Sequence, residues 1–197
     1  MRTARSPVVV GRDEQLAAIG SVLSELPRRG ACLFLLGEAG SGKTRLLRET
    51  RDRARARDLP CLVAGASRLG APPAFGVLAE AFRGWTRSNP VPETLAQFGA
   101  GLRQVLPELT APRAADLTPD QVRLLAVEGA FRLLAHVGSK AGTVLMLDDL
   151  QDADPETLAF LHHAAAGAAS EPVVVIGAVR IPEGAPEIGR ASCRERV

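Results

Sequence analysis

The chain has 197 residues, a hydrophobic content of 46% and a formal net charge of +2. This length suits one α/β domain, and the hydrophobic content supports a packed core. No apolar run approaches membrane-spanning length, and the arginine-bearing start lacks the apolar stretch of a secretion signal. We therefore expect a cytoplasmic protein without membrane contact, and the small charge favours no particular polyanionic partner.

The chain is predicted to open with a helix, a strand and a second helix. Residues 13–26 carry apolar side chains at helical spacing, and Pro27 follows them. Residues 31–36 form an unbroken apolar run, which predicts a strand buried on both faces. The next helix is predicted over 43–57, where arginines interleave with acids four residues away. That interleaving favours a solvated helix face over a nucleic-acid surface.

A phosphate-binding motif lies between this strand and the second helix. Glycines in such a loop let backbone N–H groups turn inward around a phosphate, and the following helix adds its positive end. Lys43 is predicted to reach the β- and γ-phosphates, and the Thr44 hydroxyl to bind Mg²⁺. The predicted binding segment includes the next residue, Arg45. The motif G-x-x-x-x-G-K-[ST] is matched by Gly37-Glu38-Ala39-Gly40-Ser41-Gly42-Lys43-Thr44 (37–44), hereafter the phosphate loop.

The middle of the chain predicts helices rather than strands. After a second apolar strand at 61–66, no strand-like run occurs over about 67–142, which we interpret as a helical insertion. The last helix of this region begins with Thr118-Pro119-Asp120-Gln121, a capping box with proline at the first helical position. The three helices are predicted near 74–87, 92–106 and 119–137.

Two more unbroken apolar runs, 143–147 and 172–178, predict the third and fourth strands. Strands that alternate with helices indicate an α/β fold with an open parallel sheet flanked by helices. In such a sheet the ligand binds at the carboxyl ends of the strands.

Charged residues follow both of these strands. Asp148 is predicted to hold Mg²⁺ together with Thr44, and Asp149 to orient or deprotonate the attacking water. Arg180 follows the fourth strand, where a fixed cation could sense the γ-phosphate and stabilise transition-state charge. The alternatives are ordinary loop chemistry for the acids and a surface position for the arginine. Asp154, just before Pro155, is interpreted as a helix cap rather than a catalyst.

The order of these motifs resembles the STAND-type AAA-related ATPase module of large LuxR-type bacterial transcriptional regulators. The resemblance covers nearly all of 8–180 and implies a P-loop NTPase fold of the ASCE/AAA-like kind. It also implies that the ATP- and ADP-bound states hold downstream domains differently. It implies that Val10 and Arg12 lie near the base and phosphates of the nucleotide, and that Arg180 is the sensor-1 arginine. The features that carry the resemblance are Val10-Gly11-Arg12, the phosphate loop, Asp148-Asp149, Leu150-Gln151-Asp152-Ala153-Asp154-Pro155 and Arg180.

The chain departs from that family after Arg180. The family continues with a fifth strand, a helical lid, a winged helix, sensor repeats and a DNA-binding helix-turn-helix. We therefore expect 1–187 to be an incomplete ATP-binding domain, truncated before the fifth strand and lid. Residues 188–197 resemble one reading frame of a sequencing adapter and are interpreted as a non-native tail; a genuine basic tail is the alternative. This segment carries three arginines and one glutamate, so the net charge of +2 becomes zero without it.

These observations predict Mg²⁺-ATP binding and slow hydrolysis, in a nucleotide-gated switch of a signal-responsive transcriptional regulator. The implied ligands are ATP, ADP and Mg²⁺. DNA contact is expected only through a missing C-terminal domain, and ATP-dependent self-association only for the full-length protein. The alternatives are a P-loop kinase, the ATPase segment of a nucleotide cyclase, or an inactive fragment. A kinase would need an acceptor pocket and a mobile basic lid, which the sequence does not supply.

Overall fold

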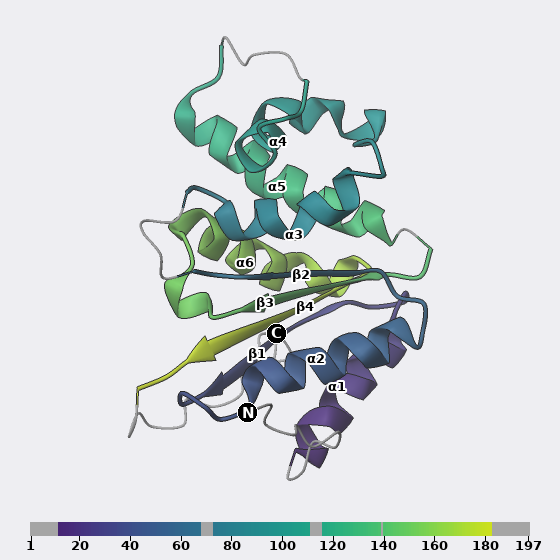
Figure 1. Ribbon diagram of the computed structural model, residues 1–197. Coiled ribbons are helices and arrows are strands. Elements are labelled where there is room, and N and C mark those ends of the chain that lie inside the picture. The colour runs from purple at the N-terminus through teal and green to yellow at the C-terminus, as the bar shows by residue number, and fades with distance from the viewer. Residues whose placement is uncertain (1–11, 68–72, 111–115, 139, 183–197) are drawn as a thin grey trace.

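The computed structural model describes residues 12–67, 73–110, 116–138 and 140–182. Val10, Gly11 and the predicted tail at 188–197 lie outside the described residues. Within the described ranges, four parallel strands form one sheet in the order β1-β4-β3-β2 (Figure 1). This confirms the predicted α/β class and parallel sheet. The strands are β1 (Ala31–Gly37), β2 (Cys61–Gly65), β3 (Thr143–Asp148) and β4 (Val173–Arg180).

Helices cover both faces of the sheet (Figure 1). On one face lie α1 and α2, and on the other lie α3 and α6, with α4 and α5 stacked further out. The α-helices are α1 (Asp13–Glu25), α2 (Lys43–Arg55), α3 (Gly76–Thr86), α4 (Gly99–Val105), α5 (Pro119–Val137) and α6 (Pro155–Gly167); short 3-10 helices are η1 (Glu93–Phe98), η2 (Leu150–Asp152) and η3 (Ala168–Ser170).

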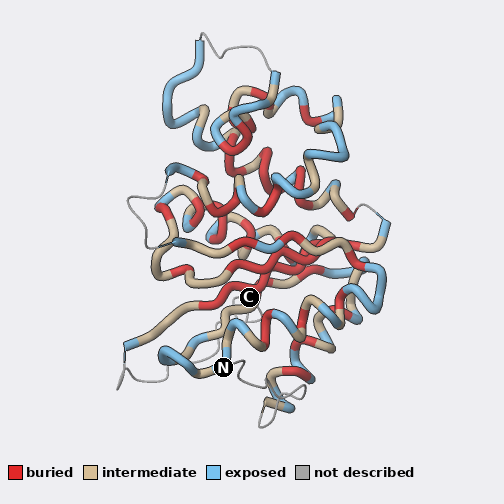
Figure 2. Tube along the Cα trace, viewed as in Figure 1, coloured by how far each residue is buried: buried red, intermediate tan, exposed pale blue. Residues whose placement is uncertain are grey.

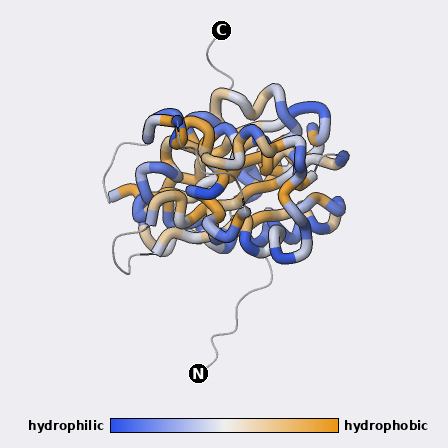
Figure 3. Tube along the Cα trace, turned by 90° about the horizontal axis from the view of Figure 1, so that it is seen from above, coloured by the Kyte–Doolittle hydropathy of each residue, from blue (hydrophilic) through white to orange (hydrophobic). Residues whose placement is uncertain are grey.

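The sheet divides the hydrophobic interior into two clusters. Successive side chains of a strand point to opposite faces, so Val144 and Met146 of β3 pack toward α1 and α2. Leu145 and Leu147 join the larger cluster with α3, α5 and α6. Burial is continuous along the central strands (Figure 2). In the perpendicular view, hydrophobic segments lie inside a hydrophilic periphery (Figure 3).

The helix predicted over 92–106 is helical from Glu93 to Val105, but its first part is not α-helical. A 3-10 helix, η1, runs to Phe98, and α4 begins only at Gly99. A Cβ on Gly101 would lie 2.2 Å from the backbone nitrogen of Ala126, so α4 and α5 approach at backbone distance. Glycine permits this packing, but it weakens a continuous α-helix. Gly101 thus allows α4 to pack closely against α5.

The predicted caps of the two following helices are confirmed. The Thr118 hydroxyl accepts the backbone N–H of Gln121, and the Gln121 side chain accepts the N–H of Thr118. Asp154 caps α6 through the backbone N–H of Thr157, at 2.8 Å. The Asp154 carboxylate is fully buried and also accepts the Phe75 N–H at 2.8 Å and the Thr157 hydroxyl at 2.7 Å. Asp154 thus joins α6 to the start of α3.

Candidate functional site

The phosphate loop connects β1 to α2 by a tight turn. The Ser41 N–H donates to the Glu38 carbonyl at 3.3 Å, and Ala39 and Gly40 form the exposed tip. Gly40 and Gly42 have φ angles of 77° and 87°. Backbone in this left-handed region strains most side chains, so glycine is required at both positions. The sequence motif therefore has a direct conformational cause.

Lys43, the first residue of α2, folds back over the loop. Its Nζ donates to the carbonyls of Gly37 and Glu38, both at 2.8 Å, and to the Ser41 Oγ at 3.3 Å. Burial lowers the pKa of Lys43, and the nearby Arg180 guanidinium lowers it further, against the attraction of Asp148 and Asp149. A bound phosphate would offer this ammonium a stronger, charged acceptor.

Arg12 reaches the same loop from the segment before α1. Its Nη2 donates to the Ser41 carbonyl at 2.6 Å. Arg45 lies in the first turn of α2 and is half-buried. The loop is thus surrounded by cationic side chains from two separate segments, an arrangement that favours a polyanion.

The end of β3 meets the loop through Thr44. The Thr44 hydroxyl donates to Asp148 Oδ2 at 2.6 Å, across 104 positions of sequence. The other oxygen, Asp148 Oδ1, accepts the Asp149 backbone N–H at 2.9 Å. A hydroxyl and a carboxylate held together are hard oxygen ligands of the kind that Mg²⁺ takes, along with phosphate and water oxygens. The described residues contain no group of three His, Cys, Asp or Glu side chains that could hold a metal by themselves.

Asp149 and Arg180 face each other at the same sheet edge. Arg180 Nη2 lies 3.8 Å from Asp149 Oδ1, and the two side chains are 37% and 43% exposed. Arg180 is the last residue of β4, in register with Gly37 of the phosphate loop. The sequence placed it just after the strand; β4 extends to include it. An ion pair this open contributes little stability, so its geometry depends on other contacts.

Sequence reasoning missed Gln151, which makes those contacts. Its Oε1 accepts the Arg180 backbone N–H at 2.8 Å, and its Nε2 donates to Asp149 Oδ1 and Asp152 Oδ2, both at 2.9 Å. The sequence signals are an amide three residues after the acid that ends β3 and the place of Gln151 in the Leu150–Pro155 segment that carries the family resemblance. These signals are weak, because nothing in them reveals the contact with Arg180.

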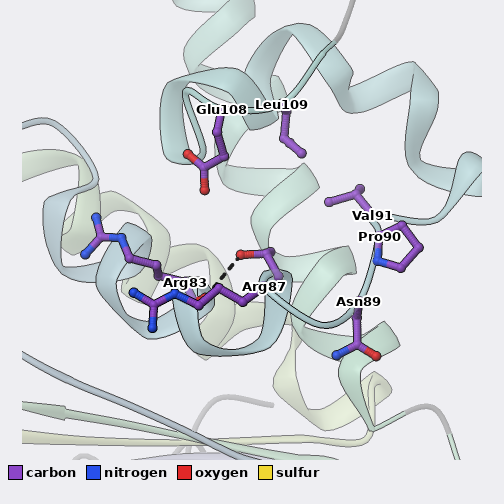
Figure 4. Close-up of a pocket in the computed structure, with 8 residues that line it drawn as sticks. Arg83, Arg87, Asn89, Pro90, Val91, Glu108 and Leu109 are labelled. Carbon is purple, nitrogen blue, oxygen red and sulfur yellow. Dashed lines mark hydrogen bonds between the residues drawn. The ribbon is translucent and has the colours of Figure 1, made fainter.

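A pocket of about 330 Å³ lies elsewhere, in the helical insertion (Figure 4). No residue of the phosphate loop lines it, and neither Asp148 nor Asp149 does. Its charged groups are the exposed side chains of Arg83, Arg87 and Glu108, from the end of α3 and the segment after α4. The Thr86 hydroxyl beside them donates to backbone carbonyls of its own helix. The pocket is separate from the candidate site.

Sequence comparison agrees with this geometry. The profile of a family described as "AAA ATPase domain" matches residues 8–176. The chain belongs to the AAA ATPase domain family. Nucleotide binding is the activity that this family suggests, and nucleotide and Mg²⁺ are the ligands that it implies. No curated protein matches the chain significantly.

The fold is shared with a solved structure. Cdc6p from Pyrobaculum aerophilum matches 92% of this chain with a TM-score of 0.55 and 15% sequence identity. A structure of Drosophila ORC bound to DNA matches 89% of the chain with a TM-score of 0.46 and 18% identity. The chain spans 42% of the first protein's length and 39% of the second's. In the described part of this AAA domain, no helix combines the length and apolarity needed to cross a membrane.

Proposed function

We propose that this AAA domain binds Mg²⁺-ATP at the phosphate loop and hydrolyses it slowly, as the nucleotide-gated switch of a signal-responsive transcriptional regulator. The 2.6 Å contact between Thr44 and Asp148 carries the biochemical part of this proposal, because it joins the loop to the end of β3. The regulatory part is supported by the order of motifs from Arg12 to Arg180, which resembles LuxR-type regulators.

Each residue of the site has a role in this proposal. The Lys43 ammonium and the backbone N–H groups of the loop hold the β- and γ-phosphates. Thr44 and Asp148 would hold Mg²⁺, which when bound neutralises charge on the phosphate oxygens. Asp149 orients the attacking water by accepting one of its protons in a hydrogen bond, and Arg180 stabilises negative charge on the γ-phosphate in the transition state.

The switch would operate through the contacts of the γ-phosphate. Arg180 ends β4 in register with Gly37, so a phosphate that attracts its guanidinium also draws it from Asp149. ATP and ADP would then leave the ends of β3 and β4 in different arrangements. In the proposed regulator, DNA contact would be made by a separate DNA-binding domain, and ATP-dependent self-association would be a property of the full-length regulator.

The proposal is tested with the two lysines of the chain, Lys43 and Lys140. Lys43→Ala should weaken ATP binding roughly a hundredfold, because it removes the cation that contacts two phosphates. Lys140→Ala, at an exposed position, is the matched control and should bind ATP as wild type does. Isothermal titration with Mg²⁺-ATP measures both. Equal affinity in the two variants would contradict the site.

The fate of the γ-phosphate separates the switch from its rivals. Incubation with γ-labelled ATP should release inorganic phosphate and label no acceptor. Transfer of the label to an added small molecule or protein would favour a kinase. ATP that neither binds nor raises the melting temperature would favour an inactive fragment.

A further inference from the structure

Gln151 lies where the pairing between two central strands stops. The β3–β4 ladder ends at Leu147 and Gly177, but β4 continues beside β1 as far as Arg180. The Ile181 N–H donates to the Gly37 carbonyl at 3.2 Å, toward β1. Because successive N–H groups of a strand point to opposite sides, the Arg180 N–H points toward the missing ladder position. The Gln151 Oε1 occupies that position.

Chemistry fixes the orientation of this amide. Its carbonyl oxygen faces a hydrogen-bond donor, the Arg180 N–H, at 2.8 Å. Its nitrogen faces two acceptors, the carboxylates of Asp149 and Asp152. A rotated amide would direct oxygen at both carboxylates and nitrogen at an N–H donor, so every contact would become repulsive. One side chain therefore joins the ends of β3 and β4.

The residues that it joins need this support. Asp149 has a φ of 52°, a left-handed conformation that side chains other than glycine rarely adopt. Its ion pair with Arg180 is half-exposed and 3.8 Å long, which holds neither side chain firmly. One N–H of the Gln151 amide donates to Asp149 Oδ1 and leaves Oδ2 to orient a water, while the amide also donates to Asp152 Oδ2.

From this geometry we propose that Gln151 is a positioning residue for hydrolysis, which holds Asp149 and Arg180 in register with the γ-phosphate. The inference rests on the ATP hydrolysis proposed above. It assigns Gln151 an effect on turnover and not on ATP affinity, because the hydrogen bonds of its side chain go to Asp149, Asp152 and Arg180 and none goes to the phosphate loop.

Two variants of the full chain test this assignment. Gln151→Met keeps the size of the side chain and removes all three hydrogen bonds. Gln151→Glu keeps the acceptor for the Arg180 N–H but replaces the donor with a carboxylate that repels Asp149 and Asp152. Both should lower kcat roughly ten- to hundredfold and leave the Kd for ATP within about twofold of wild type. Gln104→Glu, at an exposed position of α4, is the matched control and should change neither.

The pH profile supplies a readout that a purely structural role would not change. When protonated, the carboxyl group in Gln151→Glu can again donate to Asp149, so its deficit should shrink as the pH falls toward 5. The charged groups around this position are Asp149, Asp152 and the Arg180 guanidinium, which Gln151→Met also retains. The Gln151→Met deficit should therefore stay constant relative to wild type over the same range.

Each other outcome contradicts the assignment. Wild-type kcat in both variants would overturn the role of Gln151 alone. Loss of cooperative melting or of ATP binding in both variants would make Gln151 a residue of stability instead. A wild-type chain that binds ATP without any hydrolysis would overturn the proposed function and this inference with it.

Discussion

The carboxyl edge of the sheet and the helical insertion differ in how far their side chains are buried. At the edge, the charged side chains of Asp149 and Arg180 are about two-fifths exposed and the backbone is left-handed at three positions of the site. In the insertion, Leu78, Phe82 and Leu133 are fully buried, and its pocket is lined by no residue of the site. The comparison indicates that stability comes mainly from the insertion and the sheet core, so the edge can retain conformations that chemistry needs.

The largest effect should come from the core of the insertion. Phe82→Ala is expected to lower the free energy of unfolding by about 3–5 kcal/mol, because it empties a fully buried site. The folded fraction should still bind ATP with wild-type affinity. Chemical denaturation and ATP titration at low temperature measure the two properties. Leu124→Ala, where the side chain is 66% exposed, should leave both unchanged. Loss of affinity in folded Phe82→Ala would break the separation between the regions.

Thr44→Val should have the next largest effect, on hydrolysis. It keeps the shape of the side chain but removes the hydroxyl that contacts Asp148. We expect hydrolysis at limiting Mg²⁺ to fall roughly a hundredfold, which corresponds to about 2.7 kcal/mol. A Mg²⁺ titration of phosphate release should show partial recovery at high Mg²⁺. Thr94→Val, on exposed η1, is the control, and an unchanged Mg²⁺ requirement in Thr44→Val would remove Thr44 from the metal site.

Asp149→Asn should affect turnover alone. The amide retains the size of the carboxylate but is a poorer acceptor for a proton of the attacking water, so kcat should fall roughly tenfold. The variant should still bind ATP, because the hydrogen bond and ion pair of Asp149 go to Gln151 and Arg180, and Asp149 acts on Lys43 only through its charge. Single-turnover phosphate release measures this effect. A turnover equal to that of wild type would leave Asp149 with a conformational role only.

The smallest effect concerns pH. The folded-state pKa of Lys43 lies below its usual 10.5, chiefly because of burial and then of Arg180. Deprotonation removes the positive charge, so ATP affinity should decline as the pH rises. Because the pKa is lowered, this decline should begin at a lower pH than it would for an ordinary lysine. Stability of the nucleotide-free chain should change in the opposite direction, since the unfolded chain holds the Lys43 proton more tightly. ATP titrations from pH 7 to 10 check the decline, and Lys43→Arg, which stays charged, should not show it.

The sequence predicted most of the sheet and the components of the site. Unbroken apolar runs placed all four strands, and the glycine and lysine pattern placed the phosphate loop. It missed Gln151, because that role exists only where the β3–β4 ladder ends beside Arg180. Likewise, the four-residue spacing of arginines and acids over 43–57 indicated ion pairs along that helix. Glu49 does pair with Arg53, at 3.0 Å, but the Asp52 carboxylate lies 3.7 Å from its neighbour Arg51. Contacts across the fold decide such details, and local patterns do not contain them. The catalytic roles of Asp149 and Arg180 stay predictions.

The buried carboxylate of Asp154 has a consequence for how the molecule opens. One of its oxygens accepts both the Phe75 N–H at the start of α3 and the Thr157 N–H in α6. If either helix moved away from Asp154, a buried N–H donor or the buried carboxylate would lose its hydrogen-bond partner. Amide hydrogen exchange at these two positions should therefore share one opening free energy. The insertion and the segment that follows Asp149 would then open together as one cooperative unit, so local unfolding of one region would be coupled to local unfolding of the other.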